Sequence, residues 1–278
     1  MRLRNVICLS LIAIWALISF GCSHNKPIEP VQEGLILPTK SITIYNLLDL
    51  PAWLLYPKDG NAAVGIAMDS DAKKQNPKDT ALKFAEMSFA LNHGSFSTDK
   101  EEVIQYSEME ADNAAIPDFK IKIIPDPQYL EQNQYQLTSI AETSFDGYKL
   151  YLMSTDDVKA NEDIIRTSAG KTPEWCLSQS TKTDDDFVYV VGAGEDSSFI
   201  NAWKKAQENA LYKIAQFRLL NVMSTIRKTE DPTEKEKIID QVMSNIDASF
   251  AQNWLYSKTN DGKSSYNVFI MLKAKKLK

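Results

Sequence analysis

The sequence predicts an α+β protein of two tandem domains, each with helices packed on an antiparallel sheet. The first observation is a strand-like run at 187–191 that ends in Gly-Ala-Gly and leads into a helix with alanine at every fourth position. The second is a looser copy of the same order upstream, from residue 51. The third is an Asp-Gly pair between apolar runs in each half, a strong hairpin pattern. Hairpins combined with helices are typical of α+β folds.

Four landmarks recur in the same order in the two halves. The tryptophans Trp53 and Trp175 are 122 residues apart, and the Val-Gly pairs that begin at Val64 and Val191 are 127 apart. The first helix alanines, at 81 and 202, are 121 apart, and the Asp-Gly pairs at 146 and 261 are 115 apart. Such spacing indicates an internal duplication in which only loop lengths differ.

The duplication divides the chain into five parts. Residues 1–21 are expected to be a signal peptide, and 22–40 a polar tether broken by prolines. The first repeat domain takes 41–155, a polar linker takes 156–171, and the second repeat domain takes 172–278. Each domain is of ordinary size, so each is expected to bury its own core and the second to fold alone.

The first 21 residues have the features of a bacterial export signal. Arg2 and Arg4 precede an apolar run at 6–20, which is too short for a comfortable membrane span. An ordinary secretory signal shares both features, so it is the alternative to a lipoprotein signal.

The end of this segment resembles a bacterial lipobox. Gly21 places a small residue before Cys22, although Ser19 and Phe20 stand where that pattern has leucine and a second small residue. Cleavage after Gly21 and acylation of Cys22 would hold the chain on a bilayer, since each buried methylene contributes about 0.8 kcal/mol. Ser23 rather than aspartate follows, as in lipoproteins sorted to the outer membrane. We therefore expect an outer-membrane lipoprotein of the bacterial envelope, with its domains facing the periplasm.

The net charge of the chain disfavours one class of partner, and its cysteine content excludes a disulfide framework. Loss of Arg2 and Arg4 with the signal takes the net charge from −6 to −8, which disfavours nucleic acid as a partner. Three cysteines, Cys8, Cys22 and Cys176, allow no disulfide framework in the mature chain. Cys176 is expected to be buried as a small hydrophobe.

The first domain is predicted to open with a strand at 42–45 and a hairpin that joins 53–56 to 62–68. Asp79 is the expected N-cap of a helix that ends at Gly94. A second helix within 99–111 and a strand at 119–124 follow. The domain is expected to close with a hairpin that joins 138–144 to 148–153.

The second domain repeats this plan. Its first helix is expected to begin after Ser197 and to bury a stripe of seven residues. They are Phe199, Ala202, Trp203, Ala206, Ala210, Ile214 and Phe217. Asp231-Pro232 starts another helix, with a stripe that extends to Phe250. The closing hairpin joins 254–256 to 266–272.

The motif that most resembles a cofactor site is Gly192-Ala193-Gly194. It follows a strand and opens a helix, as in dinucleotide-binding folds. Ser197 replaces the third glycine, and Glu195 and Asp196 would repel a pyrophosphate. We interpret the motif as a tight strand-to-helix turn, and we assign no cofactor to the chain.

No catalytic or metal-binding residues are assigned. The two histidines are His24 in the tether and His93 near a helix end, where contact with the last carbonyls is the favoured role. The acidic residues Asp184, Asp185 and Asp186, and the pair Asp69 and Asp71, lack the glycine and closing glutamate of a calcium loop, so solvated turns are expected. Trp53 and Trp175 are expected to pack in the two cores.

The second half resembles the Lpp-twenty family of bacterial envelope lipoproteins, which includes flagellum-associated outer-membrane members. The resemblance lies in Pro173-x-Trp175, in the strand that ends Val191-Gly192-x-Gly194, and in the helix through Ala210-Leu211-Tyr212. It covers 173–274 well and 51–153 loosely, because Phe89 replaces the third alanine. The family implies helices on an antiparallel sheet and no established catalytic residues.

Three classes of function follow from these observations. The favoured one is an envelope-anchored protein with a structural or interaction role, held to the membrane by its lipid and in contact with other envelope proteins or itself. A lipoprotein that binds a small ligand is the alternative, and an enzyme is third, because no catalytic site is visible.

Lipidation at Cys22 gives the first testable prediction. Metabolic labelling with palmitate should mark the wild-type chain and should not mark Cys22→Ser, because the thiol accepts the acyl groups. Cys176→Ser is the matched control and should label like the wild type. Persistent labelling of Cys22→Ser would exclude the assignment.

Overall fold

The computed structural model describes residues 43–57, 62–70, 76–109, 117–131, 137–157, 159–178 and 180–277. The predicted signal peptide and tether, with Gly21, Cys22 and His24, lie outside these residues. Within them, no helix is long and apolar enough to cross a membrane. Helices pack against antiparallel sheets, which confirms the predicted α+β class.

The second half contains the longest elements. The strands are β10 (Phe187–Asp196), β11 (Ala248–Asn260) and β12 (Lys263–Lys275), and the helices are α7 (Phe199–Lys228) and α8 (Pro232–Met243). The strands lie in the order β10-β12-β11, with β12 antiparallel to both neighbours.

The first half repeats this topology in shorter elements. They are β3 (Ala62–Met68), α3 (Pro77–Asn92), β6 (Thr138–Phe145) and β7 (Tyr148–Ser154), and the strand order is β3-β7-β6. A register shift lies in the equivalent strands β6 and β11. Both closing turns have positive φ at Asp and Gly, as the predicted hairpins require. The shared connectivity agrees with an internal duplication.

Several predicted elements of the first half differ in the structure. Residues 53–56 do not form a hairpin strand, because β3 pairs with β7 and Ala52–Leu55 form the short helix α2. The N-H groups of Ala52 and Trp53 are bound by carbonyls at 161 and 163. Helix α3 starts earlier than predicted, because Asn76 caps it and proline is tolerated at its first position.

The described residues between 95 and 131 form small elements that contact α7, α8 and α3. Strands β4 (Ser95–Ser97) and β5 (Lys122–Ile124) pair with each other, and α5 (Gln128–Glu131) was not predicted. Helix α4 (Lys100–Glu108) confirms the expected second helix, with Asp99 as its cap.

One strand of the first half joins the sheet of the second half, and the predicted linker also contains a paired strand, so it is not a free connection. Strand β1 (Thr43–Asn46) pairs with β11, at the edge opposite β9 (Lys182–Thr183) in a five-stranded sheet. Within the linker, β8 (Ile164–Thr167) pairs with β2 (Leu48–Pro51), and a 3-10 turn, Ala169–Lys171, leads to α6 (Glu174–Ser178).

Most of the hydrophobic core is common to both halves, whereas two separate cores were expected, and only a smaller cluster around Ala81, Ala85 and Phe89 lies within the first half. Residues 41–278 form one compact unit, and one hydrophobic cluster runs through both halves. The ring of Phe199 packs on Phe145 and Tyr148 of the first half, with centroids 5.4 and 5.5 Å apart. The Tyr148 hydroxyl also accepts a hydrogen bond from the Phe199 N-H, at 3.1 Å. A fragment 172–278 would expose this face of Phe199.

Helices α3 and α7, one from each half, are joined by a buried polar contact. The Gln207 amide accepts from the Ser88 hydroxyl at 2.8 Å and donates to the Ser88 carbonyl at 2.9 Å. The same amide donates to Asn92 Oδ1 at 2.8 Å. Because buried polar groups without partners cost about 1–3 kcal/mol each, this contact fixes how the two helices align.

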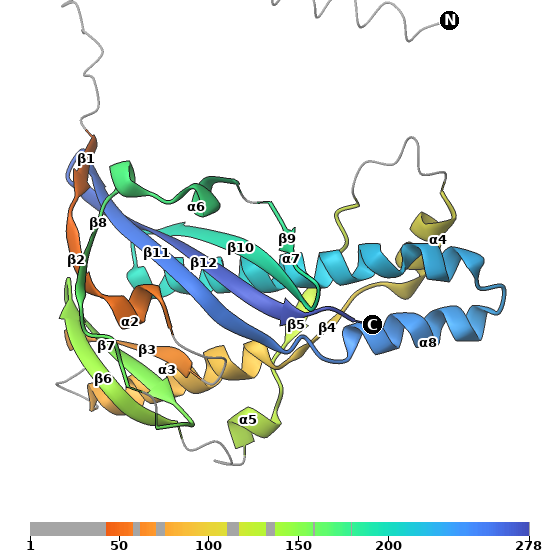
Figure 1. Ribbon diagram of the computed structural model, residues 1–278, viewed down its shortest axis with the longest axis horizontal. Helices are drawn as coiled ribbons and strands as arrows, with labels where there is room; N and C mark the ends of the chain where they lie inside the picture. The colour runs from red at the N-terminus through yellow and green to blue at the C-terminus, as the bar shows by residue number, and fades with distance from the viewer. Residues whose placement is uncertain are drawn as a thin grey trace, which may run out of the picture. The chain divides into compact units, whose positions relative to one another are not determined.

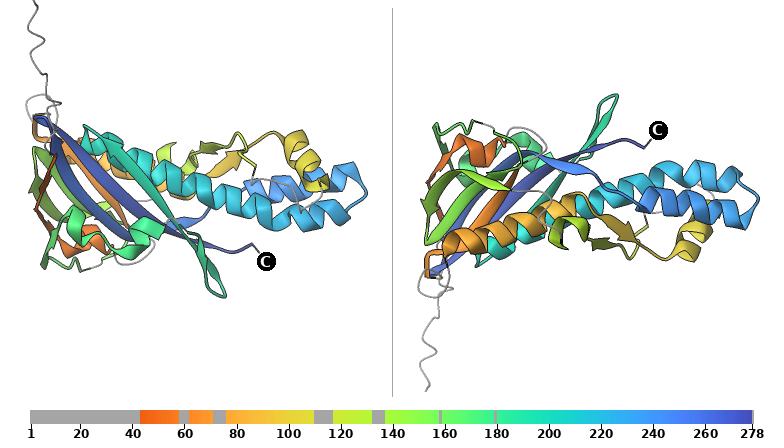
Figure 2. Two further views of the ribbon diagram at one scale, coloured as in Figure 1. Left: turned by 90° about the horizontal axis from the view of Figure 1, so that it is seen from above. Right: turned by 90° about the horizontal axis from the view of Figure 1, so that it is seen from below.

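The C-terminal half of α7 continues beyond the strands it packs on (Figure 1). There it contacts α8 and α4, which also touch each other, as both views in Figure 2 show. Helix α8 begins as predicted, with Asp231 capping the N-H of Thr233 at 2.9 Å. It ends at Met243, so Phe250, expected on its stripe, lies in β11 instead.

Glycines set the distance between β10 and α7. A Cβ on Gly192 would lie 1.9 Å from the Ala206 carbonyl oxygen and 2.4 Å from the Ala210 nitrogen. In the first half, a Cβ on Gly65 would lie 2.6 Å from the Ala81 carbonyl oxygen. The structural counterpart of Ala81 is therefore Ala206, not Ala202 as the sequence spacing suggested.

This contact gives a stability prediction. Gly192→Ala should lower the free energy of unfolding by about 1–3 kcal/mol, because the new methyl forces α7 away from the sheet. Gly170→Ala is the matched control, since a Cβ there meets nothing within 4 Å, and it should change stability by less than about 0.5 kcal/mol. Urea unfolding measures both. Equal stability of the two variants would show that the helix position does not depend on this glycine.

Candidate binding site

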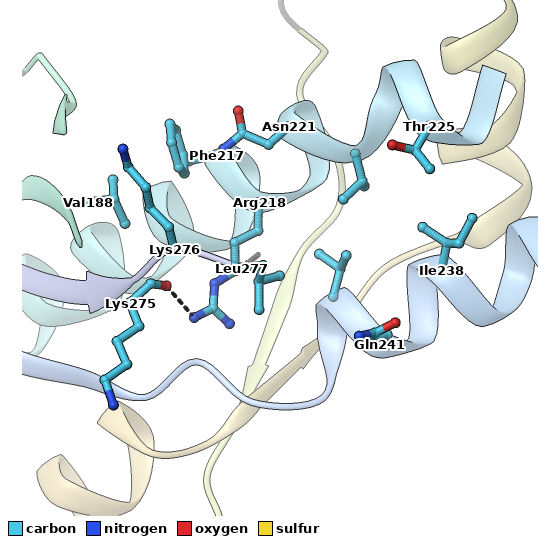
Figure 3. Close-up of a pocket in the computed structure, with 12 residues that line it drawn as sticks. Val188, Phe217, Arg218, Asn221, Thr225, Ile238, Gln241, Lys275, Lys276 and Leu277 are labelled. Atoms are coloured by element: carbon cyan, nitrogen blue, oxygen red, sulfur yellow. Dashed lines mark hydrogen bonds between the residues drawn. The ribbon is translucent and has the colours of Figure 1, made fainter. Parts of the chain in front are cut away.

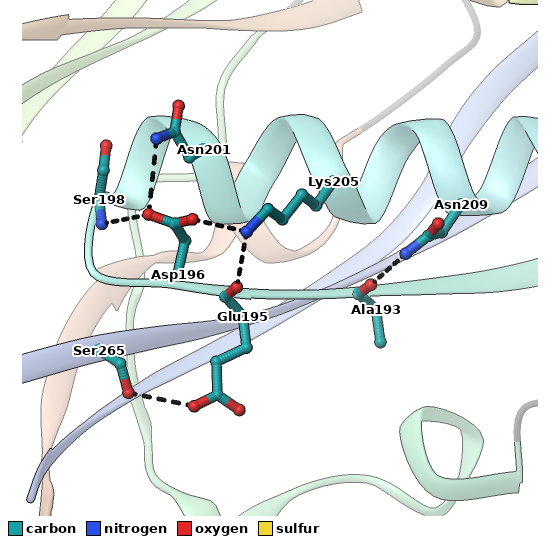
Figure 4. Close-up of polar contacts among 8 residues, drawn as sticks. All are labelled: Ala193, Glu195, Asp196, Ser198, Asn201, Lys205, Asn209 and Ser265. Atoms are coloured by element: carbon teal, nitrogen blue, oxygen red, sulfur yellow. Dashed lines mark hydrogen bonds and ion pairs between the residues drawn. The ribbon is translucent and has the colours of Figure 1, made fainter. Parts of the chain in front are cut away.

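The Gly192-Ala193-Gly194 segment belongs to the strand-to-helix connection, and its acids are bound within the protein (Figure 4). Asp196 accepts from Lys205 Nζ at 2.6 Å and from the Ser198 N-H at 2.9 Å. The Lys205 hydrogen bond is the main cause that lowers the Asp196 pKa to about 2. Glu195 pairs with Lys258 at 2.7 Å. These contacts fit the predicted tight turn.

The other residues singled out in the sequence have structural surroundings. Asp184 accepts from the N-H groups of Asp186 and Phe187 at 3.0 and 2.7 Å, which forms the predicted turn before β10. Cys176 is fully buried, as predicted, and burial raises the pKa of its thiol. Trp53 is buried as predicted, whereas Trp175 is only partly buried against the core.

His93 follows the last residue of α3, as predicted, and contacts the second half. Its Nδ1 lies 3.2 Å from an Asp247 carboxylate oxygen, and its ring stacks on Tyr129 with centroids 5.0 Å apart. Burial lowers the His93 pKa, opposed in part by the nearby charges of Asp247 and Asp126. Among the described residues, no group of three or more His, Cys, Asp or Glu side chains could hold a metal ion.

An apolar groove lies between α3 and α7, with a volume of about 520 Å³. Phe84, Met87 and Leu91 line it from α3, and Ile200 lines it from α7. Met87 is 42% exposed. Charged residues at the groove are Lys83, Lys204 and Glu208, so it has the apolar centre and polar rim of a protein interface. We refer to it as the interhelix groove.

A second cavity, of about 340 Å³, lies between α7, α8 and the residues that follow β12 (Figure 3). We name it the Arg218 pocket after the arginine that lines it. The other polar side chains that line it are those of Asn221, Thr225, Gln241, Lys275 and Lys276, and the apolar ones are those of Val188, Phe217, Val222, Ile238, Val242 and Leu277.

Arg218 is the most unusual residue of this pocket because it is a cation on the buried face of α7, only 4% exposed. Its guanidinium donates to the carbonyls of Asn245 and Ile246, the latter at 2.6 Å. It also donates to the Lys275 carbonyl at 3.3 Å. These bonds hold the turn after α8, which explains why that helix stops before the predicted stripe ends.

The position of Arg218 in the sequence indicates that its charge is unusual, although it belongs to no motif. Arg218 stands four residues after Ile214, on the face of α7 predicted to be buried. A cation at such a position is rarely buried without an anionic partner. The remaining pocket residues come from four separate segments, which only the fold brings together.

Comparisons with protein-family models, with curated proteins and with solved structures found no match to this chain. The resemblance to the Lpp-twenty family therefore stays a prediction.

The burial of His93 predicts a pH dependence of stability. Its folded pKa lies below the unfolded value of about 6.5, so the folded state binds fewer protons and loses stability as pH falls through that value. His93→Gln removes this titration while the carboxylates Asp247 and Asp126 remain.

Urea unfolding at pH 8 and pH 5 measures the effect. The free-energy advantage of wild type over His93→Gln should be smaller at pH 5. An advantage that grows at pH 5 would mean that attraction to Asp247 outweighs burial.

Proposed function

We propose that the protein is a membrane-anchored lipoprotein of the bacterial envelope that has a structural or protein-interaction role and turns over no substrate. The N-terminal sequence supports the anchor, through Arg2, Arg4, the apolar run and Gly21-Cys22. An anchor of two or more acyl chains would restrict the protein to a membrane surface.

The interhelix groove carries the interaction role. Its centre is apolar and partly exposed, and it lies between the equivalent helices of the two halves. Contact through the groove would bury Met87 and Phe84 while leaving the lysines at its rim in water, which is how protein interfaces are built. A second copy of this chain is the simplest partner, because anchored copies meet at high local concentration.

The side chains that line the Arg218 pocket support the absence of turnover there. The described polar residues there are cations, amides and one hydroxyl. Arginine, lysine, amide and hydroxyl side chains do not gain or lose a proton near pH 7 unless their pKa is strongly shifted. General acid and base catalysis needs such a group.

Small-ligand binding is the second candidate function, and the Arg218 pocket favours it. Its volume of about 340 Å³ falls within the range of ligand pockets, and its apolar walls surround a few polar groups.

Site-specific photocrosslinking in intact cells tests the interaction role. A photoreactive residue at Met87 should give a crosslinked product of twice the chain mass, because that side chain lies in the groove. Leu177, which is 68% exposed on α6, is the matched control and should give none. Pull-down of an untagged copy by a tagged one should then be weakened by substitution of the residues that line the groove.

Two outcomes would change the proposal. A Met87 product that contains a different envelope protein would retain the interaction role and replace self-association. If neither position gave any product, the interaction role would be wrong for this surface.

A further inference from the structure

Arg218 is a buried charge without an anionic partner among the described residues. All three of its hydrogen-bond acceptors are neutral backbone carbonyls. Its Nε is buried and has no partner there. Asp247 is the acid whose charge acts on it, and that carboxylate contacts His93. Buried charges in proteins are normally paired, so the lack of an anionic partner at Arg218 indicates a place where an anionic ligand could bind.

The described charged side chains that line the pocket are also cations and not acids. Lys276 extends toward Val188 and Phe217, while the Lys275 side chain runs away from Arg218 (Figure 3). No acidic side chain lines the pocket among the described residues, although the chain as a whole carries a net charge of −6. The charged side chains that line this pocket are therefore cationic, which favours an anionic ligand in it, while Asp247 acts on Arg218 from outside the pocket.

The lining of the pocket also contains apolar side chains. Val222 on α7 and Ile238 and Val242 on α8 line the pocket, and Leu277 lines it after β12. A neighbouring cavity of about 650 Å³ shares Arg218, Gln241 and the segment after β12, and it is lined in addition by the acids Asp186 and Asp247, so the anion is expected in the Arg218 pocket and not in this cavity. A free inorganic anion would leave these apolar walls unoccupied, whereas a ligand with a hydrocarbon part would cover them.

We propose that the Arg218 pocket binds a small amphiphile with one anionic head group, of the fatty-acid class. The head group lies at Arg218 and receives further donors from Asn221 and Gln241. The hydrocarbon chain lies along Val222 and Ile238. This site rests on the second candidate function, small-ligand binding, and names the class of ligand.

Arg218 also has a structural role, because it holds the carbonyls after α8. If the bonds to these carbonyls were the only role of Arg218 and its charge did not reach a ligand, the pocket would bind charged and uncharged head groups equally well. The two roles therefore differ in one measurable property, which is whether a charged head group binds better than an uncharged one of the same chain length.

Isothermal titration calorimetry of the wild-type pocket measures this preference directly. The protein is the mature chain, residues 22–278, with Cys22→Ser so that no acyl chain of its own is attached. The probes are decanoate, decyl phosphate, 1-decanol and inorganic phosphate. Decanoate should bind about ten- to a hundredfold more tightly than 1-decanol, since hydrogen bonds to charged groups contribute about 1.5–3 kcal/mol.

The other probes distinguish the head group. Decyl phosphate that bound more tightly than decanoate would identify a phosphate monoester as the head. Tight binding of inorganic phosphate alone would overturn the amphiphile and leave an anion site.

Variants localise the binding. Val222→Trp fills the pocket and should abolish decanoate binding, whereas Ser224→Trp, on an exposed position of the same helix, should not. Arg218→Gln should weaken decanoate about tenfold or more and leave 1-decanol unchanged. Lys228→Gln, at an exposed position in the last turn of α7, is the matched control for loss of one cation from that helix, and circular dichroism checks that each variant is folded.

Equal affinity for decanoate and 1-decanol in the wild type would overturn the proposal, and this comparison needs no variant. Unchanged decanoate binding in folded Val222→Trp would also overturn it. Neither result affects palmitate labelling of Cys22 or crosslinking at Met87, so failure of the ligand site is distinguishable from failure of the envelope role.

Discussion

The close packing of β10 against α7 is the contact on which the rest of the fold depends. Gly192 and Gly194 leave no room for a Cβ, so the helix backbone lies against the strand. Alanines at 202, 206 and 210 complete this face. With the axis fixed in this way, the larger residues Phe199 and Trp203 point into the core, and the helix end extends beyond the sheet to meet α8 and α4.

The two halves form one interlocked body, although they have the same topology. Strand β1 of the first half completes the sheet of the second, and β8, between the halves, pairs with β2. The contact of Gln207 with Ser88 joins the equivalent helices, and a polar contact of this kind permits one alignment only. Surfaces that a single repeat would expose are therefore covered by the other copy.

The extension of α7 beyond the sheet places Arg218 between α7, α8 and the residues that follow β12. Arg218 lies C-terminal to the part of α7 that contacts the glycines of β10. Its guanidinium donates to a backbone carbonyl in the turn between α8 and β11. The space between the helices and the residues after β12 becomes the Arg218 pocket. Arg218 thus binds the carbonyls that follow α8 and the carbonyl at the end of β12, and it is one of three described cationic residues that line the cavity.

The sequence by itself determined the α+β class, both Asp-Gly hairpins, the alanine face of α7 and the start of α8, because each depends on local periodicity or capping. It could not show that 52–55 form a helix, that 164–167 pair with β2, or that α8 stops at Met243. Those features depend on carbonyls and N-H groups supplied by residues far away in the chain. The Arg218 pocket was decided by tertiary structure for the same reason, since its walls come from segments that have no pattern in common.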